Sequence, residues 1–178
     1  MRLPEKYENE MKDLLQEEYE AYKESLGLPI QQGYRINTEK ISKEEWEKIA
    51  PFSAKEVPWI ENGYFLLDDF RASRHPYYFA GLYYLQEPSA MTPASRLPIE
   101  PDDRVLDLCA APGGKATELG SRIGEGGMLL ANDISNSRAK ALLRNLEIQG
   151  VGRLLVTSED PEKLVTLYPA FFDKILLD

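Results

Sequence analysis

The sequence is short of cysteine and histidine, with one residue of each among 178. A single cysteine excludes both a disulfide within the chain and a zinc site made of cysteines, and we expect no metal ion. Long hydrophobic runs are also missing, since none approaches the roughly 18 residues that span a membrane. The first residues, Met1-Arg-Leu-Pro-Glu-Lys, do not resemble a signal peptide. These absences predict a cytoplasmic protein without membrane association.

Positive charge is in short supply as well. The chain has 21 basic and 30 acidic residues and a formal net charge of -9, which is unusual for a protein that binds nucleic acid. Much of the charge imbalance lies in residues 1–25, which contain eight acidic and four basic residues. Such a run is typical of a solvated helix face, so the acidity weakens an RNA-binding interpretation without excluding it.

The first half of the chain predicts a small domain of helices and strands. Residues 4–25 have apolar side chains at helical spacing and are expected to form one amphipathic helix. Ser42 is followed three residues later by Glu45, which is a capping box for a second helix that ends at Pro51. Further elements are expected as an extended segment at 33–37, strands or extended segments at 59–67 and 77–84, and a short helix at 88–96.

A change of pattern divides the chain at about residue 98. Pro98 and Pro101 punctuate the junction, so we expect an α+β domain at 1–98 and a second domain at 99–178. In the second domain short apolar runs alternate with helical segments, which predicts an α/β fold with a parallel sheet and helices on both of its faces. The expected strands are 104–109, 128–131, 153–157 and 173–177, and the expected helices are 115–123, 136–149 and 161–167. Right-handed crossovers and a reversal after the third strand give the strand order 3-2-1-4.

A small-residue loop follows the first of these strands and opens a helix. A strand, a glycine turn and a helix N-terminus commonly hold a nucleotide-like ligand, because backbone N–H groups face it at close range. The phosphate-binding loop pattern fails, since Cys109 replaces its first glycine and Ala116 its hydroxyl residue. The dinucleotide pattern fails too, because Gly113 and Gly114 are adjacent. Asp133 follows the second strand, and its carboxylate suits the two hydroxyls of a ribose. The loop and Asp133 together favour the cofactor S-adenosylmethionine (SAM). The alternative is an ordinary turn in which Asp133 caps the next helix.

Three segments resemble the NOP/Sun family of RNA cytosine-C5 methyltransferases. They are the loop Cys109-Ala-Ala-Pro-Gly-Gly-Lys115, the upstream segment Tyr83-Tyr-Leu-Gln-Glu-Pro-Ser-Ala-Met91, and Ala131-Asn-Asp-Ile-Ser135 followed by Arg138. The resemblance extends over about residues 69–178. It implies a Rossmann-like SAM-dependent methyltransferase sheet, here with four of seven strands, and therefore an N-terminal fragment of a longer protein.

The resemblance also implies roles for individual residues. The cofactor-binding residues would be Cys109, Ala110, Ala111, Pro112, Gly113, Gly114, Lys115, Asp133, Arg138, Asp160 and Asp178. Glu159 could replace Asp160 near the adenine, and Asp160 could instead cap the helix at 161–167. In the family a cysteine adds to cytosine C6 and a carboxylate assists at N3. Asp178 matches that carboxylate and is the one candidate catalytic residue, whereas the nucleophilic cysteines are not in this chain.

Other residues with functional chemistry have simpler interpretations. Cys109 is expected to be a small buried hydrophobic side chain. His75 could be a general base, but a plain loop histidine is the better interpretation. Arg71 and Arg74 could meet phosphate or be solvated. The tyrosines at 77, 78, 83 and 84 could stack on bases, but packing in a core between the two domains is the better interpretation.

The leading hypothesis is a SAM-dependent enzyme that forms 5-methylcytosine in ribosomal or transfer RNA, with this chain alone inactive. A methyltransferase with another acceptor is one alternative. A non-catalytic cofactor-binding or interaction domain is the other, favoured if the protein ends at Asp178.

Overall fold

The computed structural model describes residues 3–28, 30–68 and 71–178, so the first two residues of the family resemblance, 69 and 70, lie outside the described part. The chain forms two compact units, residues 1–30 and 31–178, which are described separately. Within the described ranges, no helix has both the length and the apolar character needed to cross a bilayer.

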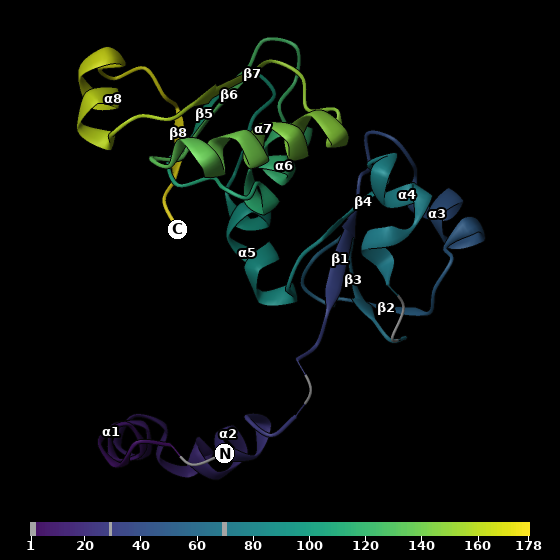
Figure 1. Ribbon diagram of the computed structural model, residues 1–178, viewed down its shortest axis with the longest axis vertical. Coiled ribbons are helices and arrows are strands. Elements are labelled where there is room, and N and C mark those ends of the chain that lie inside the picture. Colours follow the sequence, from purple (N-terminus) through teal and green to yellow (C-terminus); the bar gives the residue numbers. More distant parts are fainter. Residues whose placement is uncertain (1–2, 29, 69–70) are drawn as a thin grey trace. The chain divides into compact units, whose positions relative to one another are not determined.

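The first unit is a pair of short helices (Figure 1). It consists of α1 (Glu5–Leu15), a 3-10 turn (Gln16–Glu18) and α2 (Tyr19–Ser25). The prediction of one continuous helix over 4–25 was therefore wrong, because Gln16 has a left-handed φ of 47° and interrupts it. The break brings Glu8 within hydrogen-bonding distance of the Tyr19 hydroxyl and the Lys23 ammonium group, and Tyr19 is buried.

The second unit begins with an antiparallel sheet of strand order β2-β3-β1-β4. Its elements are β1 (Gly33–Ile36), α3 (Lys43–Ile49), β2 (Ala54–Glu56), β3 (Gly63–Leu66), a 3-10 turn (Ala72–Arg74), α4 (Pro76–Phe79) and β4 (Tyr83–Leu85). The capping box at the start of α3 is confirmed, since Ser42 and Glu45 exchange both hydrogen bonds. One face of this sheet packs an aromatic core in which Tyr34 contacts Trp46, Phe52 and Tyr83.

Two strand predictions in this half were wrong in part. The segment 59–67 begins as a turn and becomes a strand only at Gly63, and β2 lies upstream of it. The segment 77–84 starts as the helix α4, because Pro76 favours a first helical turn and the Nδ1 atom of His75 accepts a hydrogen bond from the Tyr77 N–H. Of the four tyrosines expected to pack between the two domains, Tyr77, Tyr78 and Tyr83 pack in the aromatic cluster of this sheet, whereas Tyr84 lines the cavity beside the small-residue loop.

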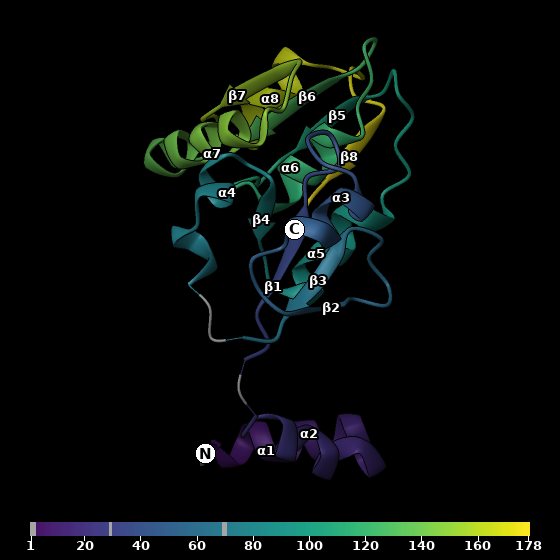
Figure 2. The ribbon, with the colours of Figure 1, turned by 90° about the vertical axis from the view of Figure 1, so that its right-hand side faces the viewer.

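A parallel sheet of strand order β7-β6-β5-β8 forms the rest of the second unit (Figure 2). Its elements are α5 (Pro88–Arg96), β5 (Arg104–Asp107), α6 (Gly114–Ser121), β6 (Met128–Asn132), α7 (Asn136–Gln149), β7 (Leu154–Thr157), α8 (Pro161–Leu167) and β8 (Lys174–Leu176). In chain order the strands read 3-2-1-4, which confirms the predicted topology and the α/β class. All three pairings are parallel, so the carboxyl ends of the strands meet at one edge.

Helices cover the two faces of this sheet unequally. On one face α5, α6 and α7 enclose a core that includes Ala94, Leu119 and Leu142. On the other face α8 and the segment after it border an apolar hollow of about 270 Å³ next to Leu106, Leu108 and Ile175. The residues of β5 therefore alternate, with Val105 in the three-helix core and Leu106 on the opposite face.

Candidate cofactor site at the sheet edge

The small-residue loop connects the carboxyl end of β5 to the first turn of α6. Gly113 immediately precedes α6 with a φ of 115°, a conformation that side chains with a Cβ rarely adopt. No side chain caps the helix there, and the N–H groups of a first helical turn have no partner within the helix. The loop therefore presents a set of backbone donors at the edge where the parallel strands end.

Side chains from neighbouring elements hold the loop by its carbonyl groups. Asn132, at the end of β6, donates its amide N–H to the Leu108 carbonyl oxygen at 3.2 Å. From α7, Arg138 donates to the Ala111 carbonyl and Asn145 to the Pro112 carbonyl, each at 2.8 Å. Because these carbonyl groups accept hydrogen bonds from side chains, the loop is held in place and the N–H groups of the first turn of α6 are not used for this purpose.

Asp107 is a site residue that the sequence analysis missed. It ends β5, is 2% exposed, and its Oδ2 atom is buried without a hydrogen-bond partner among the residues that the structure describes. Burial raises the pKa of Asp107 to about 7, against the lowering effect of Lys115 and of the Cys109 N–H. An acidic residue inside an otherwise apolar strand was the signal in the sequence. A buried carboxylate oxygen without a partner beside free N–H donors is suited to a cationic group on a ligand.

Asp133 follows β6 at the same edge and is 2% exposed. Its Oδ1 atom accepts a hydrogen bond from the Ser135 N–H at 3.0 Å, and its Oδ2 atom lies 3.3 Å from the Arg138 guanidinium. Arg138 thereby touches both the loop and Asp133. The two features that the sequence singled out are joined in space by this arginine.

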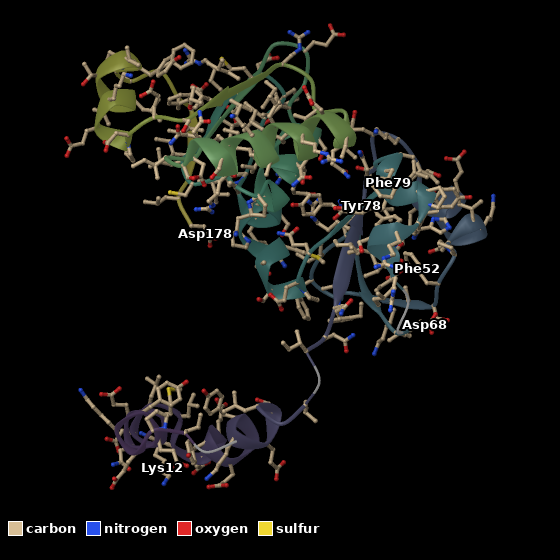
Figure 3. The ribbon with its side chains drawn as sticks, in the orientation of Figure 1. Lys12, Phe52, Asp68, Tyr78, Phe79 and Asp178 are labelled. Atoms are coloured by element: carbon tan, nitrogen blue, oxygen red, sulfur yellow. The ribbon has the colours of Figure 1, made fainter. Side chains whose placement is uncertain are left out.

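Lys115 and Asp178 form an ion pair, with Nζ and Oδ2 2.5 Å apart. Asp178 follows β8, next to the strand that carries the loop (Figure 3). A cavity of about 210 Å³ opens beside this pair, lined by Tyr84, Gln86, Asp107, Cys109, Pro112 and Lys115 among others. The structure therefore gathers most residues of the predicted loop around one small cavity, and Asp178 is linked to it through its ion pair with Lys115.

Asp160 and Glu159 follow β7, the next strand along the edge. Asp160 caps α8, since its Oδ1 atom accepts the Glu162 N–H at 2.9 Å, as the alternative interpretation expected. The Glu159 N–H donates to Asn132 Oδ1 at 3.0 Å, and Glu159 also pairs with Lys163. Asn132 thus connects the ends of three strands, a role that nothing in its local sequence indicated.

The burial expected for Cys109 was wrong, because its side chain is exposed. Ala110 and Ala111 take the buried positions of the loop instead, at 5% and 7% exposure. Cys109 therefore lies at the cavity and not in the core. Elsewhere, His75 begins α4 through its hydrogen bond to the Tyr77 N–H, and Arg74 is exposed near it.

Comparison with known proteins agrees with this arrangement. Residues 3–88 match the N-terminal domain of the 16S rRNA methyltransferase RsmF, and residues 94–178 match the 16S rRNA methyltransferase RsmB/F family. Ribosomal RNA small subunit methyltransferase F of Pectobacterium atrosepticum is 32% identical over 99% of this chain. That alignment covers 39% of the relative, so the chain spans about two fifths of its length.

Solved structures show the same fold. A methyltransferase homologue from Pyrococcus horikoshii is 33% identical with a TM-score of 0.79, covering 87% of this chain and 52% of its own. The structure of NSun6 from Pyrococcus horikoshii with SFG has a TM-score of 0.81 at 21% identity, covering 98% of this chain and 70% of its own. The two family matches together account for nearly the whole chain, which therefore belongs to the RsmB/F methyltransferases of the NOP/Sun family.

Proposed function

We propose that this chain binds SAM and is the cofactor-binding part of an enzyme that forms 5-methylcytosine in ribosomal RNA. One observation supports the proposal. The loop that is held by its carbonyl groups, the Asp107 carboxylate with its unpaired oxygen and the buried Asp133 all lie at the same edge of the parallel sheet. Transfer RNA is the second candidate substrate. We place the reaction in the cytoplasm and the domain boundary at about residue 98.

The residues present fit the chemistry of the cofactor. The N–H groups of the loop would hold the methionine carboxylate, and Asp107 would take the amino group with its free oxygen. Asp133 would accept hydrogen bonds from the ribose hydroxyls, and Asp160 or Glu159 would lie near the adenine. When bound, SAM supplies an electrophilic methyl group on a cationic sulfur.

The acceptor side of the site is represented by Asp178. Its carboxylate forms an ion pair with Lys115, a residue that lines the cavity. We propose that it contacts the N3 edge of the target cytosine. Cys109, the single cysteine, lies within the cofactor loop, so we expect the 178-residue chain to bind SAM without methylating RNA. Transfer of labelled methyl groups from SAM into 16S rRNA by this chain would contradict that expectation.

Titration calorimetry of the chain with SAM tests the proposal directly. Replacing Asp133 with alanine removes hydrogen bonds to a charged acceptor, each of which contributes about 1.5–3 kcal/mol. We expect SAM affinity to fall by about tenfold to a hundredfold. Asp103→Ala is the matched control, because Asp103 contacts Lys174 and the Glu100 N–H near the start of β5. Equal SAM affinity in the wild-type chain and Asp133→Ala would refute the ribose assignment, and no binding by the wild-type chain would refute the cofactor proposal.

A further inference from the structure

Arg35 is a buried cation on an inner strand of the antiparallel sheet. It lies in β1, where successive side chains alternate between the two faces of the sheet. Tyr34 and Ile36 belong to the aromatic core on one face, and Arg35 therefore points to the other. The residue is 4% exposed although its side chain carries a full charge. A charge is retained in such a place only where hydrogen bonds and a counter-charge compensate for its lost hydration.

Every arm of the Arg35 guanidinium has a partner outside the aromatic core. The Nε atom donates to Gln86 Oε1 at 3.0 Å, and one terminal nitrogen forms an ion pair with the buried Glu118 carboxylate. The other terminal nitrogen donates to the Gly114 carbonyl at 2.7 Å and to Thr117 Oγ1 at 2.9 Å. Three of these partners lie in α6, the helix that the cofactor loop opens. Arg35 therefore connects the antiparallel sheet to the start of that helix.

Gly114 is the point at which this connection reaches the loop. It is the first residue of α6, and its carbonyl accepts from both Arg35 and Thr117. A Cβ at this position would lie 3.0 Å from Gln86 Nε2 and 3.3 Å from Tyr84 Cε1, so the backbone packs closely on β4 and the residue that follows it. The loop end is thus held against the antiparallel sheet by both hydrogen bonds and close packing.

Arg35 completes a set of contacts that begins on the opposite side of the loop. Arg138 and Asn145 hold the Ala111 and Pro112 carbonyls from α7, and Arg35 holds the Gly114 carbonyl from β1. We propose that Arg35 is a positioning residue that holds the cofactor loop in its binding geometry and thereby sets the affinity for SAM. The inference rests on the proposed function and deepens it, because it makes the antiparallel sheet part of the cofactor site.

A second connection between the same parts of the unit provides the control. Lys40 donates to the Ala80 carbonyl at 2.9 Å and to the Ile148 carbonyl at 2.7 Å, near the end of α7. This contact also ties the antiparallel half to the parallel half, but its partners lie outside the loop and the first turn of α6. Lys40→Met should therefore weaken the contact between the antiparallel and parallel halves without disturbing the cofactor site.

Two Arg35 variants separate positioning from general stability. Arg35→Lys keeps a cation beside Glu118 but loses the planar fork that reaches Gly114 and Thr117 together. The double variant Arg35→Met/Glu118→Gln removes both charges, so no buried charge is left unpaired, and glutamine still accepts from Asn62. Failure of both variants to fold would make Arg35 a residue of global stability and would overturn the positioning role.

The first readout is amide hydrogen exchange of the peptide 108–117, measured without ligand. Its Leu108 and Ala110 N–H groups are hydrogen-bonded to Leu176 and Asn132, so local loosening is measurable. We expect amide exchange of this peptide to be about tenfold faster in both Arg35 variants, because each loses at least one hydrogen bond to a charged group. The exchange rate should stay unchanged in Lys40→Met. Loop exchange equal to that of Lys40→Met would overturn the inference.

The second readout is SAM affinity by calorimetry, with an expected loss of about tenfold in the Arg35 variants and none in Lys40→Met. Faster loop exchange with unchanged affinity would also overturn the inference. If the wild-type chain did not bind SAM, the proposed function would fail, while the exchange comparison would still decide whether Arg35 holds the loop.

Discussion

Replacing Asp107 with asparagine should change how the stability of the ligand-free chain depends on pH. Burial raises the pKa of this carboxyl from its ordinary value of 3.8 to about 7 in the folded chain. Each tenfold change in an equilibrium constant corresponds to about 1.36 kcal/mol. The charged carboxylate is therefore about 4 kcal/mol less favourable in the folded chain than in the unfolded chain.

The direction of the effect follows from proton binding. Between pH 4 and pH 7 the folded chain retains the Asp107 proton while the unfolded chain has released it, so raising the pH favours unfolding. This contribution is absent below the unfolded pKa and complete above about pH 7. The free energy of unfolding of the wild-type chain should thus fall across this window by up to about 4 kcal/mol relative to Asp107→Asn, which has no proton to lose there.

Urea denaturation at pH 4.5, 6 and 8, followed by circular dichroism, measures this difference. Asp173→Asn is a control whose stability difference from the wild-type chain should stay constant over this pH range, because the hydrogen bonds from Arg104 lower the pKa of Asp173 to about 2. Its contribution is present at neutral pH and is lost only as the pH falls toward 2. If the wild-type and Asp107→Asn curves ran parallel from pH 4.5 to pH 8, the burial argument for Asp107 would be refuted.

Two further predictions concern the loop cysteine and the aromatic core. Cys109 is exposed at the cavity, so saturating SAM should slow its alkylation by iodoacetamide; equal rates with SAM bound would contradict the placement of the cofactor. Because the chain has one cysteine, the denatured chain gives the control rate directly. Trp46 is 1% exposed among Tyr34, Phe52 and Tyr83, so Trp46→Ala should lower the free energy of unfolding by about 3–5 kcal/mol in urea denaturation. A loss below about 1 kcal/mol would show that the aromatic cluster does not support the fold.

The parallel sheet could be predicted because its signals are local. Short apolar runs such as Val105-Leu106 are buried on both faces, and helical segments separate them, so element type and strand order both follow. The antiparallel half was harder because local patterns there compete with tertiary contacts. The aromatic segment from Tyr77 has a strand-like composition, yet Pro76 and the His75 side chain start a helical turn before the strand begins.

The candidate site likewise contains residues that the sequence could predict and residues that it could not. The loop and Asp133 could be found because their residue types are unusual at the ends of strands. Arg35 could not, since its partners lie about 80 residues away in α6 and nothing near it in the sequence indicates them. Cys109 was placed wrongly because the choice between it and its alanine neighbours depends on how the loop turns, which composition does not determine.

The dispersed support of the loop has a consequence for engineering this fold. The residues from Cys109 to Lys115 form a compact motif, yet three of their carbonyl groups accept hydrogen bonds from Arg138, Asn145 and Arg35, which lie in α7 and β1. Grafting the seven-residue motif onto a different parallel sheet would transfer the sequence of the loop without the side chains that hold its conformation. A transplant would have to include these three supporting side chains, so the smallest portable module is a set of positions spread across more than one hundred residues of chain.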